Sequence, residues 1–329
     1  MTTRRWILER PSDLAGIGLV VASAFCYSML SIFGKVALAL RLPVLPLLAT
    51  RFTLGALILW AWVLAVGEYR QAVGRVPRAR AAGLLLWGAI GFSGQSALFF
   101  LALQRIPASL TEVLLYTCPA FLALMLWGIT RRSPKVSRLL AIGLALLGTW
   151  LCAGPIAGAT DTRGVALAIL AGFWYAAFLI WMHHLTPGIP AAVSGAYIVT
   201  ASALTFVAAS MLRGEGLLVP RGAAAWGAVL GMVLSATVFG FVLFVVGLKR
   251  VGPQAASVLS TFEPLGTLLL AAIFLGERLN GTQWCGAALI IGAAFVLAST
   301  SERDDLIGPA DAPVPLIPET ASESPGAST

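Results

Sequence analysis

The chain has 329 residues, of which 59% are hydrophobic and only 11% are charged, and its mean hydropathy is +0.90. A soluble domain of this length needs far more charge to cover its surface, so the composition excludes an ordinary soluble protein. The net charge of +8 could suggest nucleic acid, but the basic residues lie mostly in short loops between apolar runs. We therefore expect a lipid bilayer, and no nucleic acid, around this chain.

The N-terminus carries Arg4, Arg5 and Arg10, followed by a long apolar run from Leu14. This run is too long for a signal-peptide core and lacks a convincing cleavage site, so we predict a retained first membrane span. Because a span needs about 20 apolar residues, the pattern predicts ten transmembrane helices. They are expected at roughly 14–40, 44–67, 81–103, 107–129, 139–156, 164–185, 191–212, 223–248, 254–275 and 283–300. The segment 301–329 is rich in Pro, Ser, Ala and acid, and is predicted to be a disordered tail.

The distribution of Lys and Arg predicts the orientation of these spans. With the N-terminus inside, fourteen of the 22 Lys and Arg residues fall in inner segments and six in outer loops, while Lys35 and Arg51 lie within spans. Cytoplasmic loops carry the excess of basic residues in membrane proteins. Both termini are therefore expected in the cytoplasm, and the tail with them.

An internal repeat relates the two halves of the chain. The stretch from Phe99 to Pro119 aligns without gaps on the stretch from Phe244 to Pro264. The matched pairs include Arg105 with Arg250 and Pro119 with Pro264; earlier, Gly16 aligns with Gly164 and Tyr27 with Tyr175. Each repeat spans five helices, an odd number, so the second repeat must cross the membrane in the opposite sense. Inverted repeats of this kind build a substrate site at their interface and transport by alternating access.

Several motifs resemble the EamA domain of the drug/metabolite transporter superfamily. The motifs are Ala255-Ala256-Ser257, Glu263-Pro264, the closing Leu275-Gly276-Glu277-Arg278, Arg51-Phe52 and Phe173-Trp174-Tyr175. The resemblance implies an all-helical transporter with repeats at 13–156 and 162–300, an exporter or permease of small metabolites in the bacterial inner membrane. The first repeat departs from the pattern, with Ile129-Thr130-Arg131-Arg132 in place of the closing motif and Glu112 where many members carry a small or apolar residue.

Two acids lie deep within predicted spans, Glu112 in the fourth and Glu263 in the ninth. An intramembrane charge is expensive and marks a functional hypothesis by default. We interpret both as candidates for proton coupling or for recognition of an amine; the alternative is a structural hydrogen bond to a neighbouring helix. They do not align in the repeat, since Glu112 pairs with Ser257 and Cys118 with Glu263.

Further candidates for a substrate site are polar or aromatic residues within spans. Arg51 could hold a substrate carboxylate, pair with an acid or extend to the outer interface. The amphipathic candidates are Gln95, Tyr27, Tyr116, Trp174 and Tyr175, which could equally pack within the bundle. Pro119 and Pro264 are predicted kinks with a gating role. Lys35 lies near a helix end, where extension to the interface is the favoured interpretation.

The favoured function is a secondary transporter of amino acids or related amphipathic solutes, with protons as a candidate coupling ion and a homodimer left open. An integral-membrane enzyme and a non-transporting scaffold are the alternatives. An enzyme is disfavoured because HExxH and paired acids within one span are absent from the sequence, and His183 and His184 alone make no metal site. The four cysteines, Cys26, Cys118, Cys152 and Cys285, have neither metal-ligand nor redox spacing. No cofactor or metal is therefore expected.

Overall fold

The computed structural model describes residues 14–131, 136–153, 161–251, 256, 259–260 and 262–299. All regular secondary structure in this part of the chain is helical. Seven helical segments are long and apolar enough to span a membrane: Leu14–Ala39, Val44–Ala65, Arg78–Leu103, Ala108–Ile129, Thr162–Met182, Ala191–Leu212 and Ala223–Gly247. Three shorter apolar segments follow the same pattern: Leu139–Gly148, Phe262–Phe274 and Gly281–Val296. The predicted polytopic helical membrane protein is thereby confirmed.

The helices follow one another with short connections. In the first half they are α1 (Leu14–Ala39), α2 (Val44–Ala65), α3 (Gly67–Arg75), α4 (Arg78–Trp87), η1 (Gly88–Phe92), α5 (Ser93–Leu103), α6 (Ala108–Leu115), α7 (Cys118–Thr130) and α8 (Val136–Ala153). In the second half they are α9 (Thr162–Leu185), α10 (Ala191–Leu212), α11 (Ala223–Met232), η2 (Val233–Gly240), α12 (Phe241–Val251), α14 (Phe262–Phe274) and α15 (Gly281–Ser299). The predicted tail 301–329 and the start of the predicted span 254–275 lie outside the described residues.

The surface of the bundle is apolar and its interior contains many small polar residues. Large side chains such as Leu57, Leu204 and Phe274 are each more than 60% exposed. Serine and threonine residues are buried instead, among them Ser23, Ser28, Ser31, Thr111 and Ser202. A bilayer explains this inverted arrangement, because lipid tails solvate leucine while small residues let helices approach closely.

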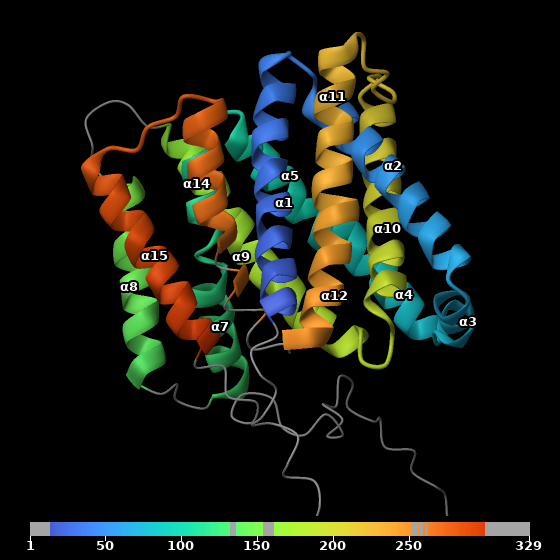
Figure 1. Ribbon diagram of the computed structural model, residues 1–329, viewed down its shortest axis with the longest axis horizontal. Coiled ribbons are helices and arrows are strands. Elements are labelled where there is room, and N and C mark those ends of the chain that lie inside the picture. The colour runs from blue at the N-terminus through green and yellow to red at the C-terminus, as the bar shows by residue number, and fades with distance from the viewer. Residues whose placement is uncertain are drawn as a thin grey trace, which may run out of the picture.

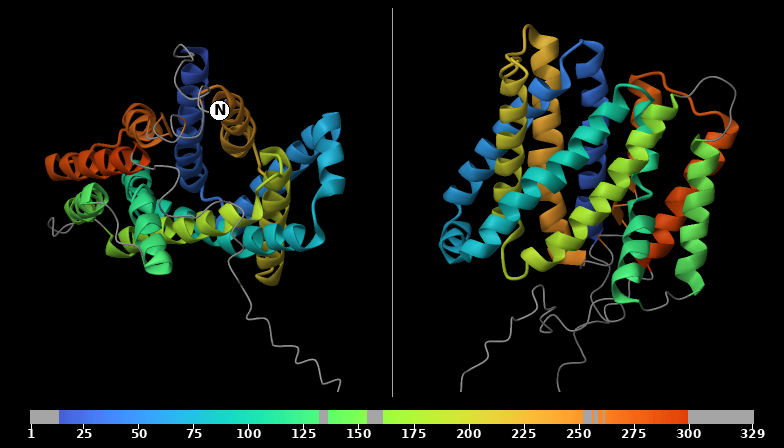
Figure 2. Two further views of the ribbon diagram at one scale, coloured as in Figure 1. Left: turned by 90° about the horizontal axis from the view of Figure 1, so that it is seen from below. Right: turned by 180° about the vertical axis from the view of Figure 1, so that it is seen from behind.

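Figure 1 shows the helices standing side by side, with α8 and α15 at the left side of the bundle and α2 and α10 toward the right side. Seen from below, these two groups of helices are well separated (Figure 2). The main packing partners are α8 with α15, α2 with α10, α1 with α12 and α14, and α9 with α5 and α7. The end of the bundle that contains Leu14 is called the proximal end below, and the end that contains Ala39 the distal end. The last residues of α15 also lie toward the proximal end (Figure 1).

Two helical segments contain π-helical turns, η1 between α4 and α5 and η2 between α11 and α12. The alignment that pairs Phe99 with Phe244 places the start of η1, Gly88, opposite the start of η2, Val233. A π-turn leaves carbonyl oxygens that other groups must satisfy. At η1, Ser202 Oγ of α10 donates to the Gly88 carbonyl at 3.0 Å and Trp174 Nε1 of α9 donates to the Ile90 carbonyl at 3.1 Å.

Two glycines bring helices from different halves of the chain into close contact. A Cβ atom at Gly16 of α1 would lie 2.8 Å from Arg250 Cβ of α12. A Cβ atom at Gly164 of α9 would lie 2.8 Å from Arg105 Cβ, just after α5. Since Gly16 aligns with Gly164 and Arg105 with Arg250, the same contact occurs twice with the halves exchanged.

Candidate functional site

Glu112 of α6 is buried inside the bundle, with a side chain that is only 3% exposed. Its Oε2 atom accepts a hydrogen bond of 2.7 Å from Ser31 Oγ of α1. Ser31 is itself fully buried, and no ion pair of Glu112 occurs among the described residues. A buried carboxyl group without a cation beside it is the kind of group that can exchange a proton or take up a ligand amine.

Glu263 lies in the first turn of α14, where Pro264 follows it. Its backbone carbonyl accepts a hydrogen bond of 2.7 Å from Ser28 Oγ of α1, so serines one helical turn apart on α1 contact both acidic residues. Its carboxyl oxygen Oε2 lies 3.0 Å from the hydroxyl of Tyr116, and the same hydroxyl lies 2.8 Å from the carbonyl oxygen of Ser260. Helix α1 thus brings the two acids of distant sequence positions to one place.

The three tyrosines that the sequence singled out gather around these acids. Tyr27, Tyr116 and Tyr175 all lie within electrostatic range of Glu263. Glu112 and Glu263 also interact electrostatically with each other. We call these five residues the acid cluster; its members come from α1, α6, α9 and α14 and the short break after α6.

The hydroxyl of Tyr116 carries one hydrogen but contacts two oxygen atoms. The Ser260 carbonyl can only accept a hydrogen bond. Both contacts can therefore be hydrogen bonds at once only when Glu263 is protonated and donates to the tyrosine oxygen. A negative Glu263 would compete with Ser260 for the same hydrogen, so the geometry couples the position of one proton to the charge of Glu263.

Arg51 of α2 is buried away from the lipid-facing surface, with only 6% of its side chain exposed. Its guanidinium carbon lies 4.8 Å from the ring centre of Phe52 and 5.8 Å from that of Phe100. Its Nε atom has no hydrogen-bond partner, and no carboxylate of the described residues forms an ion pair with it. Among the described residues Arg51 therefore has no acidic partner, which was one of the three alternatives that its sequence position left open.

The remaining candidates lie elsewhere. Trp174 donates its indole hydrogen to the π-turn at Ile90, and Gln95 accepts a hydrogen bond of 3.4 Å from Ser96. No hydrogen bond among the described residues joins either side chain to the acid cluster. Pro119 and Pro264 each lie near the first residue of a helix, α7 and α14, and Pro119 follows the break between α6 and α7.

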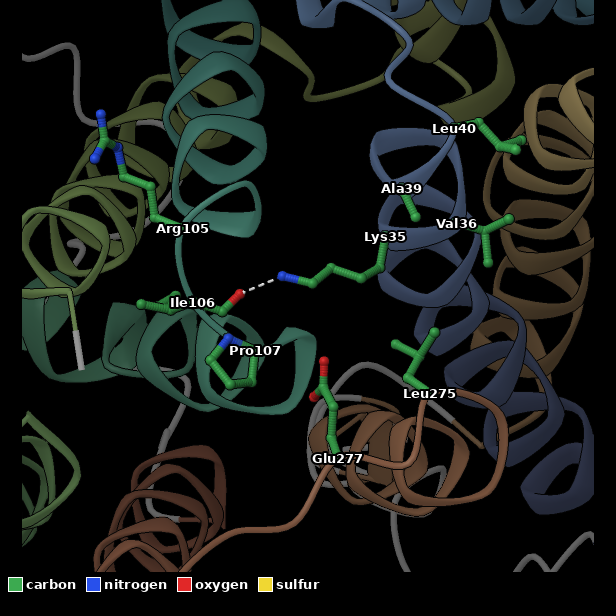
Figure 3. Close-up of a pocket in the computed structure, with 9 residues that line it drawn as sticks. All are labelled: Lys35, Val36, Ala39, Leu40, Arg105, Ile106, Pro107, Leu275 and Glu277. Carbon is green, nitrogen blue, oxygen red and sulfur yellow. Dashed lines mark hydrogen bonds between the residues drawn. The ribbon is translucent and has the colours of Figure 1, made fainter. Parts of the chain in front are cut away.

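The distal end contains a pocket that the sequence did not predict (Figure 3). Its volume is about 530 Å³, and its lining includes Lys35, Ile106, Pro107, Leu275 and Glu277. Lys35 Nζ donates to the carbonyl oxygens of Leu103 and Ile106, both at 2.7 Å. Lys35 therefore binds a helix end of its own protein. The sequence had instead favoured extension of its side chain to the membrane interface.

Arg105 lies beside this pocket and connects the two halves of the chain. Its guanidinium donates to Asp161 Oδ2 at 2.9 Å, and Asp161 also accepts hydrogen bonds from the backbone N–H groups of Arg163 and Gly164 at the start of α9. The hydrogen bond from Arg105 holds the pKa of the Asp161 carboxyl below its ordinary value. Because both side chains are well exposed, this ion pair is a modest contribution to stability.

The fold is that of a polytopic helical membrane protein. The EamA-like transporter family matches residues 14–154 and again 162–299, and the chain belongs to this family. The uncharacterized transporter YwfM of Bacillus subtilis is 28% identical over 223 residues, which are 67% of this chain and 74% of that protein. The threonine/homoserine exporter RhtA of Escherichia coli (strain K12) is 28% identical over 271 residues, 79% of this chain and 83% of that protein.

The fold itself also has a solved counterpart. A crystal structure at 21% identity superposes with a TM-score of 0.61 and covers 87% of this chain and 96% of that chain. The names of the relatives describe transporters rather than enzymes. The chain is therefore a membrane transporter of small metabolites, as its sequence predicted.

The sequence missed Ser28 and Ser31, which contact the two acids, and it missed the role of Lys35. The signal for the serines was present, because two polar residues three positions apart in an apolar span share one helix face. Glu277 was visible in the closing motif of the second repeat, but its contact with α6 depends on how distant helices pack.

Proposed function

We propose that this transporter is an exporter of amino acids or similar amphipathic solutes that works by alternating access. The observation that carries the proposal is the acid cluster, in which one buried carboxyl group from each half of the chain interacts with the other in the company of three tyrosines. Such a cluster binds either a cationic amine or protons, but an amine and a full set of protons compete for the same oxygen atoms. That competition is what proton-driven exchange requires.

We further propose ten spans arranged as two inverted five-helix repeats at 13–156 and 162–300. The exchanged contacts of Gly16 and Gly164 support this arrangement, as does the matched start of the two π-turns. The packing of α1 on α12 and of α9 on α5 is a further exchanged pair. Inverted repeats place the site at their interface, where the acid cluster contains residues of both halves.

The proximal end is proposed to face the cytoplasm of a bacterial inner membrane, with both chain termini there. The start of α1 and the end of α15 lie on this side, and so do α3 and the start of α4 (Figure 1). These two helices carry Arg70, Arg75, Arg78 and Arg80, and basic residues concentrate on the cytoplasmic side. The distal end would then face outward.

The substrate is proposed to carry both an amine and a carboxylate. Glu112 and Glu263 offer a partner for the amine, and Arg51 offers a buried cation whose Nε atom has no hydrogen-bond partner and which forms no ion pair among the described residues. The name of the relative RhtA, a threonine/homoserine exporter, supports a solute of this class.

The test is efflux from proteoliposomes loaded with threonine, homoserine and a mixture of other amino acids, with and without a pH gradient. Wild-type protein should release a subset of the solutes faster when the outside solution is more acidic than the liposome interior, because protons then enter as the solute leaves. Glu263→Gln should abolish this response. The matched control is Glu68→Gln, because Glu68 is an exposed acid on α3 far from the cluster. Efflux of every pooled solute at the rate of empty liposomes would refute the proposed substrate class.

A further inference from the structure

The corner between α5 and α6 at the distal end is held by two charged side chains from other parts of the chain (Figure 3). Lys35 of α1 donates to the Leu103 and Ile106 carbonyls, at the carboxyl end of α5. Glu277, in the connection from α14 to α15, accepts hydrogen bonds from the N–H groups of Ala108 and Ser109 at 2.8 and 2.9 Å. It also accepts one from Ser109 Oγ at 2.8 Å, so five hydrogen bonds fix this corner.

Each charge has the sign that its helix end favours. The carboxyl end of a helix leaves carbonyl oxygens unpaired and carries partial negative charge, which suits the Lys35 ammonium. The amino end leaves N–H groups unpaired and carries partial positive charge, which suits the Glu277 carboxylate. Most of the hydrogen-bonding capacity of both groups is used on these helix ends. The two charged groups that line the pocket are therefore already bound to helix ends of the protein itself.

The closing motif of the second repeat builds this contact. Gly276 has a φ of +66°, a conformation that glycine adopts without strain, and it ends α14. The N–H of Glu277 then returns to the Ala271 carbonyl at 3.2 Å, an oxygen in the last turn of the helix. This turn directs the Glu277 side chain toward α6 of the other half of the chain.

The sequence provides no equivalent contact at the proximal end. The alignment that pairs Phe99 with Phe244 pairs Glu277 with Arg132, and the alignment that pairs Gly16 with Gly164 pairs Lys35 with His183. An arginine side chain only donates hydrogen bonds, so it cannot accept them from the amino end of a helix. The residues that hold the distal corner therefore have no counterpart of the same chemistry in the aligned positions of the other repeat.

We infer that Lys35 and Glu277 form the distal gate of the transport cycle, and that this gate biases the resting protein toward the conformation that is closed at the distal end. The inference rests on the proposed function, because it takes the distal end as the outer one. A protein that rests with its outer end closed presents its substrate site to the cytoplasm, so the gate prepares it to load substrate on that side. Opening the distal end must separate the α14–α15 connection from α6 and break the hydrogen bonds of Glu277.

The experiment measures the gate directly by the distance between spin labels at Gln104 and Asn280, which are exposed residues on its two sides. The four native cysteines are first replaced, and efflux by this background is checked. Wild-type gate residues should give one short distance. Glu277→Gln and Lys35→Met should each add a longer population, with an open-to-closed ratio about tenfold larger, since each loses charge-assisted hydrogen bonds. Glu215→Gln, an exposed acid at the same end, is the matched control and should leave the distance unchanged.

The second readout is the direction of transport in the same proteoliposomes. Loosening the gate should raise entry of solute from the distal side relative to efflux. Identical distance distributions for wild type, Glu277→Gln and Lys35→Met would overturn the inference, even if transport is normal. A longer distance in the variants together with no transport by the wild type would instead refute the proposed function and leave the gate contact established.

Discussion

Replacing Tyr116 by phenylalanine tests whether the acid cluster is one functional unit. The change keeps the ring and removes only the hydroxyl, which lies 2.8 Å from the Ser260 carbonyl oxygen and 3.0 Å from Glu263 Oε2. Leaving buried polar groups without this partner costs about 1–3 kcal/mol. That cost corresponds to roughly 5- to 150-fold in an equilibrium constant. We therefore expect Tyr116→Phe to raise the KM for efflux, or to lower kcat, by a factor in that range.

The assay is initial-rate efflux from proteoliposomes over a range of internal substrate concentrations, repeated at several pH values. The pH profile should shift as well, because the hydroxyl no longer links the proton of Glu263 to Ser260. Tyr197→Phe is the control, since the Tyr197 ring packs edge-on against Trp60 at 5.5 Å, in a different cluster of the core. Kinetics of Tyr116→Phe within about twofold of wild type, while Glu263→Gln abolishes transport, would refute the linkage between tyrosine and acid.

Three further predictions concern the anion, the helix contacts and the distal ion pair. Arg51→Lys keeps the charge but loses the planar guanidinium group, so it should raise the KM of carboxylate-bearing solutes by about tenfold and leave the KM of their amide analogues nearly unchanged. Equal effects on both kinds of solute would contradict carboxylate binding. Gly164→Val should lower stability by about 1–3 kcal/mol in detergent thermal inactivation because its side chain would overlap the chain at Arg105, whereas Gly18→Val, in open space, should not. Asp161→Asn should lower thermal stability at neutral pH. The difference from wild type should vanish as the pH falls below the ordinary carboxyl pKa of 3.8 and through the lowered pKa of the folded state, because a carboxyl group with a lowered pKa stabilises the fold only while it is ionised. A difference that persists in acid would assign the effect to helix capping alone.

The composition and the hydrophobic pattern of the chain determined its class. Apolar runs of span length, separated by short basic loops, have one stable arrangement in lipid, which is helices that satisfy their own backbone hydrogen bonds. The repeat and the closing motif at Leu275–Arg278 were readable for the same reason, since they are local patterns. Glu112, Glu263 and the three tyrosines were also identifiable, because polar groups inside apolar spans are rare.

Tertiary structure alone decided which of these residues meet. Glu112 and Glu263 occupy non-equivalent repeat positions, and only the packing of α1 against both α6 and α14 brings the two residues to Ser31 and Ser28. The same holds for Glu277, whose partners at α6 are distant in sequence. Sequence periodicity assigns a residue to a helix face, but the partner of that face depends on the crossing and depth of a second helix. Contacts between elements so far apart in the chain are therefore fixed by the assembled bundle, and with them the acid cluster and the distal gate.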